Sequence, residues 1–163
     1  MPIEIEFLAV APEAFGPLLD GAKLLAQSGL EPSLLVLVDL YASQLNGCAF
    51  CTALHTREGQ ALGEAGDRLS GVCAWQDASS YTARERAALE WTKAVTFIAD
   101  ERDKDELLDR LTKYFNHREI VYLTLAIVLI NSWNRFNIAF SNPPEGAEAV
   151  FNQLHPDAEL ARG

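Results

Sequence analysis

Helix start and stop signals recur along this chain, and they constrain its fold more than any other feature of the sequence. Helix-forming residues dominate between these signals, and the β-branched alternation that marks strands is scarce. Two start signals are capping boxes, Thr-Ala-Arg-Glu at residues 82–85 and Asn-His-Arg-Glu at residues 116–119. Their first and last side chains can satisfy unpaired backbone N–H groups of the first helical turn. The sequence therefore predicts an all-α fold.

Glycine, asparagine and proline mark where the expected helices end or begin. Pro32 suits a first turn, whereas Asn46-Gly47 tolerates left-handed backbone and breaks the pattern. The expected helices cover approximately residues 12–27, 33–45, 48–62, 82–98, 100–115 and 117–140. We predict about six to seven helices in all, within a single domain that spans residues 1–163. An acidic tail follows from about residue 142, with only marginal helix signals.

The last long helix contains the most apolar stretch of the chain, from Ile120 to Ile130. This stretch is too short to span a bilayer, which needs about 20 apolar residues. We interpret it as part of a buried core helix. Its expected packing face comprises Val121, Leu125, Val128, Leu129 and Trp133.

Charge and cysteine content exclude several classes of partner and environment. The formal net charge of -10 repels phosphate backbones and anionic lipids, so we expect neither nucleic acid nor membrane as a partner. Three cysteines, two of them in a tight pair, do not form the framework of a secreted disulfide-rich protein. Residues 1–6 are acidic where a signal peptide is basic. We therefore expect a cytoplasmic protein.

The sequence Cys-Ala-Phe-Cys-Thr-Ala-Leu-His at residues 48–55 is the part of the chain that can carry chemistry. In a helix that begins at Cys48, the side chains of Cys48, Cys51 and His55 fall within roughly a 60° arc. The helix N-terminus stabilises a thiolate, and an imidazole one turn from Cys51 can accept its proton. Peroxide reduction needs such a nucleophile, base and resolving thiol. These three residues are our candidate catalytic residues.

The run from Leu37 to His55 resembles the alkylhydroperoxidase D (AhpD-like) and carboxymuconolactone decarboxylase superfamily. The signature of that superfamily is an acidic residue, eleven intervening positions and then C-x-x-C-x-x-x-H, which places the core motif at residues 36–55 here. The phrase Ala-Ser-Gln-Leu-Asn-Gly-Cys-Ala-Phe-Cys closely matches the peroxidase-type branch. Further similarity lies in residues 13–29, 74–75, 84–96 and 130–135.

The resemblance implies an AhpD-like helical fold and assembly into homo-oligomers, either trimers or hexamers. It also implies hydroperoxide reduction or disulfide exchange in antioxidant defence, with an unknown thiol or disulfide protein as reductant and with no cofactor or metal. By the same resemblance, Cys51 is the thiol that attacks peroxide, beside His55. Cys48 is then the resolving and more accessible thiol.

One position departs from the superfamily pattern. Its glutamate, twelve positions before the first cysteine, falls on Val36, which cannot carry a proton, and the often basic position five residues later is Tyr41. Either the proton relay is shortened to Cys51 and His55, or another acid substitutes. Asp39 is the candidate for this substitution, because it lies one turn from Val36 on the same helix face. An aspartate at such a position is, however, more commonly just a solvent-exposed side chain.

Other functions and other roles for these residues stay open at this point. The fold could host a lactone decarboxylase, which needs acid–base groups rather than a dithiol, or a non-enzymatic assembly module that lost its relay. Cys73 could complete a zinc site, but its stretch, residues 69–75, is typical of helix interior. We expect Cys73 to be a small buried hydrophobe and expect His117 and His155 to be solvated.

Overall fold

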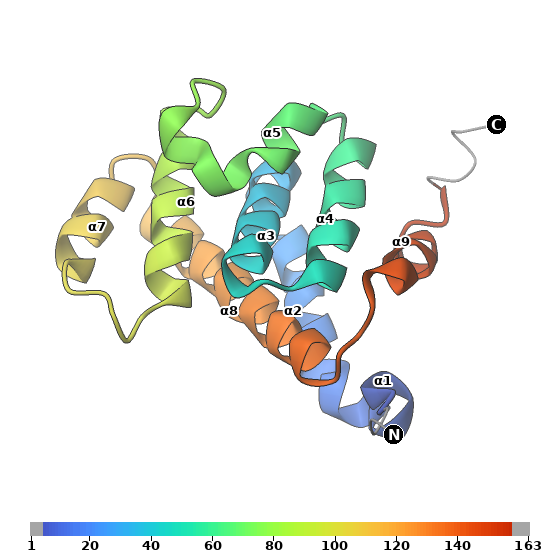
Figure 1. Cartoon of the computed structure of the whole chain (residues 1–163). Helices are drawn as coiled ribbons and strands as arrows, with labels where there is room; N and C mark the ends of the chain where they lie inside the picture. Colours follow the sequence, from blue (N-terminus) through green and yellow to red (C-terminus); the bar gives the residue numbers. More distant parts are fainter. Residues whose placement is uncertain (1–4, 158–163) are drawn as a thin grey trace.

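The structure is a computed structural model that describes residues 5–157 (Figure 1). Most of the acidic N-terminal segment and the last part of the acidic tail, residues 1–4 and 158–163, lie outside the described residues. Every regular element between residues 5 and 157 is helical, so the all-α prediction is confirmed. The elements are α1 (Phe7–Val10), η1 (Pro12–Phe15), α2 (Gly16–Ala26), α3 (Pro32–Asn46), α4 (Ala49–Ala61), α5 (Gly66–Ser70), η2 (Val72–Asp77), α6 (Ala83–Thr96), α7 (Lys104–Leu111), α8 (His117–Ala139), η3 (Pro144–Gly146) and α9 (Ala147–Leu154).

This part of the chain contains more helices than the six to seven that we predicted, because several are very short. The predicted helix at residues 12–27 is divided into η1 and α2, and the one at residues 100–115 shrinks to α7. The element α1 has no counterpart in the prediction, and the stretch at residues 69–75, which we interpreted as helix interior, is divided between α5 and η2. The tail, for which helix signals were marginal, forms α9.

The predicted helix boundaries are explained by local hydrogen bonds. Both capping boxes form: Thr82 accepts from the N–H of Glu85 and Asn116 accepts from the N–H of Glu119, while each glutamate accepts from the cap residue's own N–H. At the other end, Gly47 has a φ of 72° and terminates α3 in the left-handed conformation. Such contacts involve residues three or four apart, which is why the sequence alone predicts them.

The central helix of the fold is α3, which packs against α4, α6 and α8 (Figure 1). Leu37, Val38 and Leu40 on this helix are fully buried although they point in different directions around its axis. A helix that is apolar on nearly every side must lie inside the protein. The surrounding helices therefore hold α3, and with it the start of α4, in a fixed position.

The buried face of α8 differs from the one that we predicted. Val121 and Val128 are 68% and 48% exposed, whereas Leu129 is buried and Leu125 and Trp133 are partly buried. The main buried face is formed instead by Ile120, Leu123, Ile127 and Ile130. Because this helix is apolar nearly all round, the spacing of its apolar residues fits more than one buried face, and only the neighbouring helices decide between these faces.

No helix within residues 5–157 is long and apolar enough to cross a membrane.

The prediction for Cys73 is wrong, because its thiol is exposed. Cys73 lies on the 3-10 helix η2, where Val72 and Trp75 point into the core. A 3-10 helix repeats every three residues, so the residue between two buried positions faces solvent. The sequence pattern of this segment does not distinguish such a turn from the interior of an α-helix.

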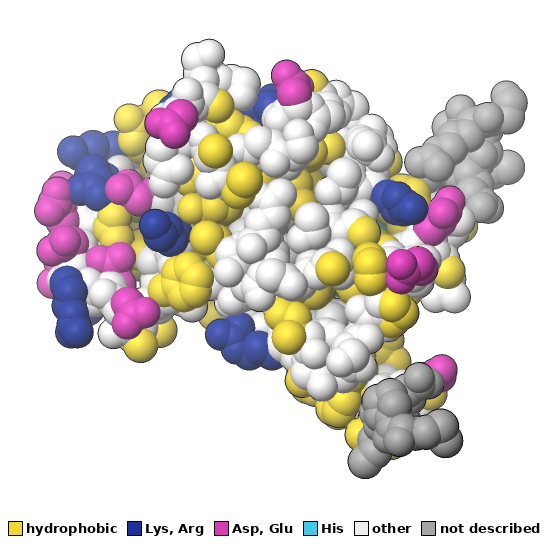
Figure 2. Space-filling view, in the orientation of Figure 1, with side chains coloured by type: hydrophobic (Ala, Val, Ile, Leu, Met, Phe, Trp, Pro, Cys, Tyr) yellow, Lys and Arg dark blue, Asp and Glu magenta, His cyan; other side chains and the backbone are white. Residues whose placement is uncertain are grey.

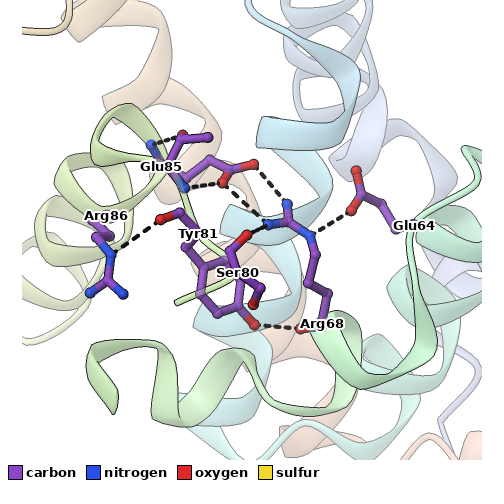
Figure 3. A network of polar contacts seen from close by, with 7 residues as sticks. Glu64, Arg68, Ser80, Tyr81, Glu85 and Arg86 are labelled. Carbon is purple, nitrogen blue, oxygen red and sulfur yellow. Dashed lines mark hydrogen bonds and ion pairs between the residues drawn. The ribbon is translucent and has the colours of Figure 1, made fainter. Parts of the chain in front are cut away.

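A network of polar contacts fastens α5 and η2 to the start of α6 (Figure 3). The guanidinium of Arg68 donates to Glu64 at 2.8 Å and to Glu85 at 2.7 Å, and it also contacts the backbone carbonyl of Ser80. The hydroxyl of Tyr81 donates to the carbonyl of Arg68 at 2.5 Å. Arg68 lies on α5, directly before η2, the element that carries Cys73. Acidic and basic side chains also gather over α7, at the left edge of Figure 2.

Candidate active site

The junction between α3 and α4 places both cysteines of the motif. Cys48 is the N-cap of α4, and its sulfur accepts a hydrogen bond from the N–H of Cys51 at 3.2 Å. The N–H of Cys48 donates to the carbonyl of Ser43 at 2.9 Å, across the left-handed turn at Gly47. The predicted start of a helix at Cys48 is therefore confirmed to within one residue. The pair lies at the positive end of the helix dipole, as the spacing suggested.

Cys48 and Cys51 form a disulfide, with their Cα atoms 5.4 Å apart. The structure therefore represents the oxidised state of the pair. Cys48 is 1% exposed and Cys51 is 2% exposed. The expectation that Cys48 is the more accessible thiol is wrong for this chain by itself, because the residue that caps α4 is enclosed where α3, α4 and the C-terminal segment meet.

Apolar side chains from four helices surround the disulfide. The cluster that includes both cysteines is completed by Ala42, Phe50, Leu54, Ile130, Ala147 and Phe151. The last two residues belong to α9, which returns from the C-terminal end of the chain and packs on α4 (Figure 1). Apolar surroundings disfavour a charged thiolate in a reduced pair. Deprotonation of a thiol here therefore requires a well-placed proton acceptor.

His55 lies on α4, one turn beyond Cys51, and two carboxylates approach the same ring nitrogen. Its Nδ1 is 2.7 Å from Oε2 of Glu58 and 3.9 Å from Oδ2 of Asp39, which comes from α3. Asp39 is partly buried rather than fully exposed. The structure thus brings together His55 and the acid that we considered as a substitute for the missing glutamate.

These charges shift one another's pKa values. Burial, followed by the nearby Glu58 carboxylate, raises the pKa of Asp39 to about 7, although His55 opposes the change. Burial by itself would lower the pKa of His55, but Asp39 and the hydrogen bond to Glu58 raise it. Burial would likewise raise the pKa of Glu58, but hydrogen bonds and charge interactions with His55 and His155 lower it. Near neutral pH, the raised pKa of Asp39 is therefore suited to proton transfer, and it lies beside a histidine whose pKa is also raised.

Glu58 is a site residue that our sequence reasoning missed. It follows His55 by three positions and Cys51 by seven, so it extends the same helix face, and this spacing was the available signal. Its second oxygen, Oε1, is 3.0 Å from Nε2 of His155, which follows α9. His155 is exposed, as predicted, but it also contacts Glu58. His117 is exposed as well.

The position of the family glutamate is filled by apolar packing. Val36 is buried beside Leu69, in a cluster that also contains Tyr41. Val36 and Leu69 both press on Gly59 of α4, where an added Cβ would lie 3.2 Å from Val36 Cγ1. An ionised side chain at position 36 would therefore enter an apolar contact between α3 and α4.

Asparagine side chains from α8 anchor the end of α3. The amide of Asn46 donates to Asn131 Oδ1 at 3.0 Å and to Asn134 Oδ1 at 2.9 Å. Asn134, which is fully buried, donates in turn to the hydroxyl of Ser43 at 3.0 Å. The guanidinium of Arg135 reaches back to the carbonyl and side-chain oxygens of Asn131. These contacts fix the turn that presents Cys48.

Within residues 5–157, no three or more Cys, His, Asp and Glu side chains are arranged to hold a metal ion. In the alternative zinc site that we considered, Cys48 and Cys51 would be two of the four ligands, but here they are bonded to each other in the disulfide. Cys73, the possible fourth ligand, is a free and exposed thiol.

A sequence profile described as the carboxymuconolactone decarboxylase family matches residues 11–94, which include α3, α4 and the Cys48–His55 motif. The chain belongs to the carboxymuconolactone decarboxylase family. An uncharacterized relative from Bacillus subtilis, YdfG, is 35% identical over 142 residues, which cover 87% of this chain and 97% of YdfG.

Solved structures of other proteins resemble this architecture. A protein of unknown function from Agrobacterium tumefaciens, provisionally described as the antioxidant defence protein AhpD, is 35% identical with a TM-score of 0.83. The match covers 87% of this chain and 97% of that protein. The debrominase Bmp8 has the same fold at 22% identity, with a TM-score of 0.74 over 88% of this chain and 77% of Bmp8. The fold by itself therefore does not determine the reaction.

Proposed function

We propose that this member of the carboxymuconolactone decarboxylase family reduces hydroperoxides, or exchanges disulfides, through the dithiol of Cys48 and Cys51. The observation that carries the proposal is a disulfide at the N-terminus of α4, with the imidazole of His55 on the next turn of that helix and the carboxylate of Asp39, whose pKa is raised, beside it on α3. The relative from Agrobacterium, provisionally linked to antioxidant defence, supports the same activity class.

The chemistry proceeds in three steps. The Cys51 thiolate attacks one oxygen of the hydroperoxide, the O–O bond breaks, and the alcohol leaves with a proton while Cys51 becomes a sulfenic acid. The Cys48 thiol then attacks that sulfur and releases water, which forms the disulfide seen here. An external dithiol protein supplies two electrons and two protons to restore both thiols. The identity of this reductant is unknown.

Acid–base catalysis in this scheme belongs to His55 and Asp39. His55 accepts the proton of Cys51, and a proton from the imidazolium goes to the leaving alkoxide. Asp39, 3.9 Å from His55, takes the place of the family glutamate as the carboxylate that stabilises the charged imidazole. The raised pKa of His55 favours that charged form.

Access to the pair is part of the proposed cycle. Both cysteines are buried in a cluster that includes Ala147 and Phe151 of α9. We propose that α9 moves away to let a protein reductant reach the pair. A small hydroperoxide needs a smaller opening. Assembly into trimers or hexamers stays a prediction from the family resemblance.

The test is peroxide-dependent consumption of a dithiol reductant by purified variants. Cys51→Ser should abolish turnover, and Cys48→Ser should stop after one turnover with a sulfenic acid detectable by mass spectrometry. Cys73→Ser is the matched control and should retain wild-type turnover, because its thiol lies outside the cluster. Unchanged turnover in both Cys51→Ser and Cys48→Ser would refute the proposal. Decarboxylation of a carboxylated lactone by those same variants would favour the decarboxylase alternative.

A further inference from the structure

Glu58 links two histidines that lie 100 positions apart in the sequence. Its Oε2 is 2.7 Å from Nδ1 of His55, and its Oε1 is 3.0 Å from Nε2 of His155. The carboxylate is only slightly exposed, and it is closer to His55 than Asp39 is. Nothing in the C-x-x-C-x-x-x-H signature includes this position.

The contact with Glu58 decides which nitrogen of His55 carries the proton. A neutral imidazole has one N–H and one lone pair, and the nitrogen that faces a carboxylate is the protonated one. Nδ1 of His55 therefore donates to Glu58, which leaves the lone pair on Nε2. Cys51 precedes His55 by four residues, so its side chain is a neighbour of the ring on the same helix face. Nε2 is thus the nitrogen available to a thiol.

The charge of Glu58 also increases the proton affinity of His55. A carboxylate within hydrogen-bond distance stabilises the imidazolium, and the pKa directions agree: that of Glu58 is lowered and that of His55 is raised. Besides Glu58, the titratable group that the structure places beside His55 is Asp39 from α3, while His155 faces the far oxygen of Glu58. In the reduced protein Cys51 also titrates, one turn before His55 on α4.

We propose that Glu58 is a positioning residue for the redox site, which fixes the Nδ1-protonated form of His55 and strengthens Nε2 as the proton acceptor for Cys51. This inference rests on the roles proposed above for Cys51 and His55. His155 directly follows α9, so the same carboxylate also connects His55 to the helix whose Ala147 and Phe151 pack in the cluster around the disulfide.

The first experiment measures the pKa of His55 by NMR in the oxidised protein, where neither Cys48 nor Cys51 titrates. In Glu58→Gln the pKa should fall by about one unit, the usual effect of losing an adjacent opposite charge. Glu58→Asp keeps the charge and should recover part of the loss. Glu148→Gln is the matched control, because it removes the ion pair with Arg57 between α9 and α4 and leaves His55 untouched.

The second experiment measures thiol reactivity in the reduced protein, with Cys73→Ser as the background so that only the pair reacts. Alkylation by iodoacetamide near neutral pH should slow about tenfold in Glu58→Gln, which is typical of losing a hydrogen-bond partner behind a functional histidine. The midpoint of the pH profile should move to higher pH. In His155→Ala, which preserves the contact between His55 and Glu58, both readouts should stay close to wild type.

A His55 pKa in folded Glu58→Gln equal to that of wild type would overturn the inference, as would an equal fall in Glu148→Gln. If Glu58→Gln does not fold, the ¹⁵N shifts of wild-type His55 decide: a protonated Nδ1 supports the inference and a protonated Nε2 overturns it. These readouts need no peroxide. A wild-type protein without peroxidase activity would therefore refute the proposed function while still testing Glu58.

Discussion

The carboxylate of Asp39 on α3 lies 3.9 Å from Nδ1 of His55 on α4. In the family signature the acidic residue occupies the position of Val36, one helical turn earlier on α3. Side chains three residues apart on a helix lie on the same face, so an acid moved by one turn can still approach the neighbouring helix. The loss of the family glutamate therefore does not remove a carboxylate from this histidine.

Replacement of this carboxylate should lower activity while it stabilises the protein. Asp39→Asn removes the acid that supports His55, and we expect peroxide-dependent turnover to fall by about tenfold or more. The folded-state pKa of Asp39, about 7, is above the ordinary value of 3.8. Its contribution to stability is thus present at low pH and lost as pH rises through about 7. Asparagine does not titrate, so the variant should gain stability relative to wild type over that range.

Urea unfolding of both proteins at several pH values measures this difference in the free energy of unfolding. Between about pH 5 and about pH 8 it should change by about 1–3 kcal/mol in favour of Asp39→Asn. Parallel pH dependences of the two proteins would contradict a raised pKa for Asp39.

Gly59 should tolerate no larger residue, because α4 touches its neighbours there. A Cβ at position 59 would lie 2.5 Å from Leu69 Cδ2 and 3.2 Å from Val36 Cγ1. Gly59→Ala should therefore destabilise the protein by about 1–3 kcal/mol despite the better helix propensity of alanine. Thermal unfolding measures the effect, as a fall in Tm of roughly 2–4 °C per kcal/mol. Gly66→Ala is the control, since a Cβ there meets nothing within 4 Å, and an equal loss in both variants would contradict the packing argument.

Weaker docking of α9 should speed reduction of the disulfide. Phe151 is buried in the cluster around Cys48 and Cys51, and Phe151→Ala removes contacts worth about 3–5 kcal/mol in a typical core. We expect the rate of reduction by dithiothreitol to rise about tenfold, because the segment opens more often. Leu154→Ala, at a 55% exposed position of the same helix, should reduce at the wild-type rate. Equal rates for Phe151→Ala and wild type would mean that α9 does not limit access.

The number of reactive thiols should depend on the redox state of the protein. The chain has three cysteines, of which only Cys73 is free in the oxidised structure. Titration with a chromogenic disulfide should detect one thiol in unreduced, denatured protein and none in Cys73→Ser. After reduction and removal of the reductant, the counts should rise by two. Three thiols in unreduced wild type would show that the disulfide is absent.

Much of the candidate site could be predicted because it depends on residues close together in the sequence. The helix start at Cys48 follows from the Asn46-Gly47 turn, and the common face of Cys51 and His55 follows from helical spacing. Glu58 extends that face by the same rule, but nothing in the sequence showed that its two oxygens would meet His55 and His155. That arrangement requires α9 to return to α4.

By itself, the sequence determined the helical fold, the ends of the main helices and the C-x-x-C-x-x-x-H motif at the start of α4. Capping, left-handed glycine and helical spacing act over a few residues, so local chemistry is sufficient for them. Only the tertiary structure decided the buried face of α8, the exposure of Cys73, the enclosure of Cys48 and the approach of Asp39 to His55. Each of these depends on which distant helix supplies the opposing surface. Because burial of apolar side chains is favourable against any apolar partner, a single segment does not encode which helix it will pack against.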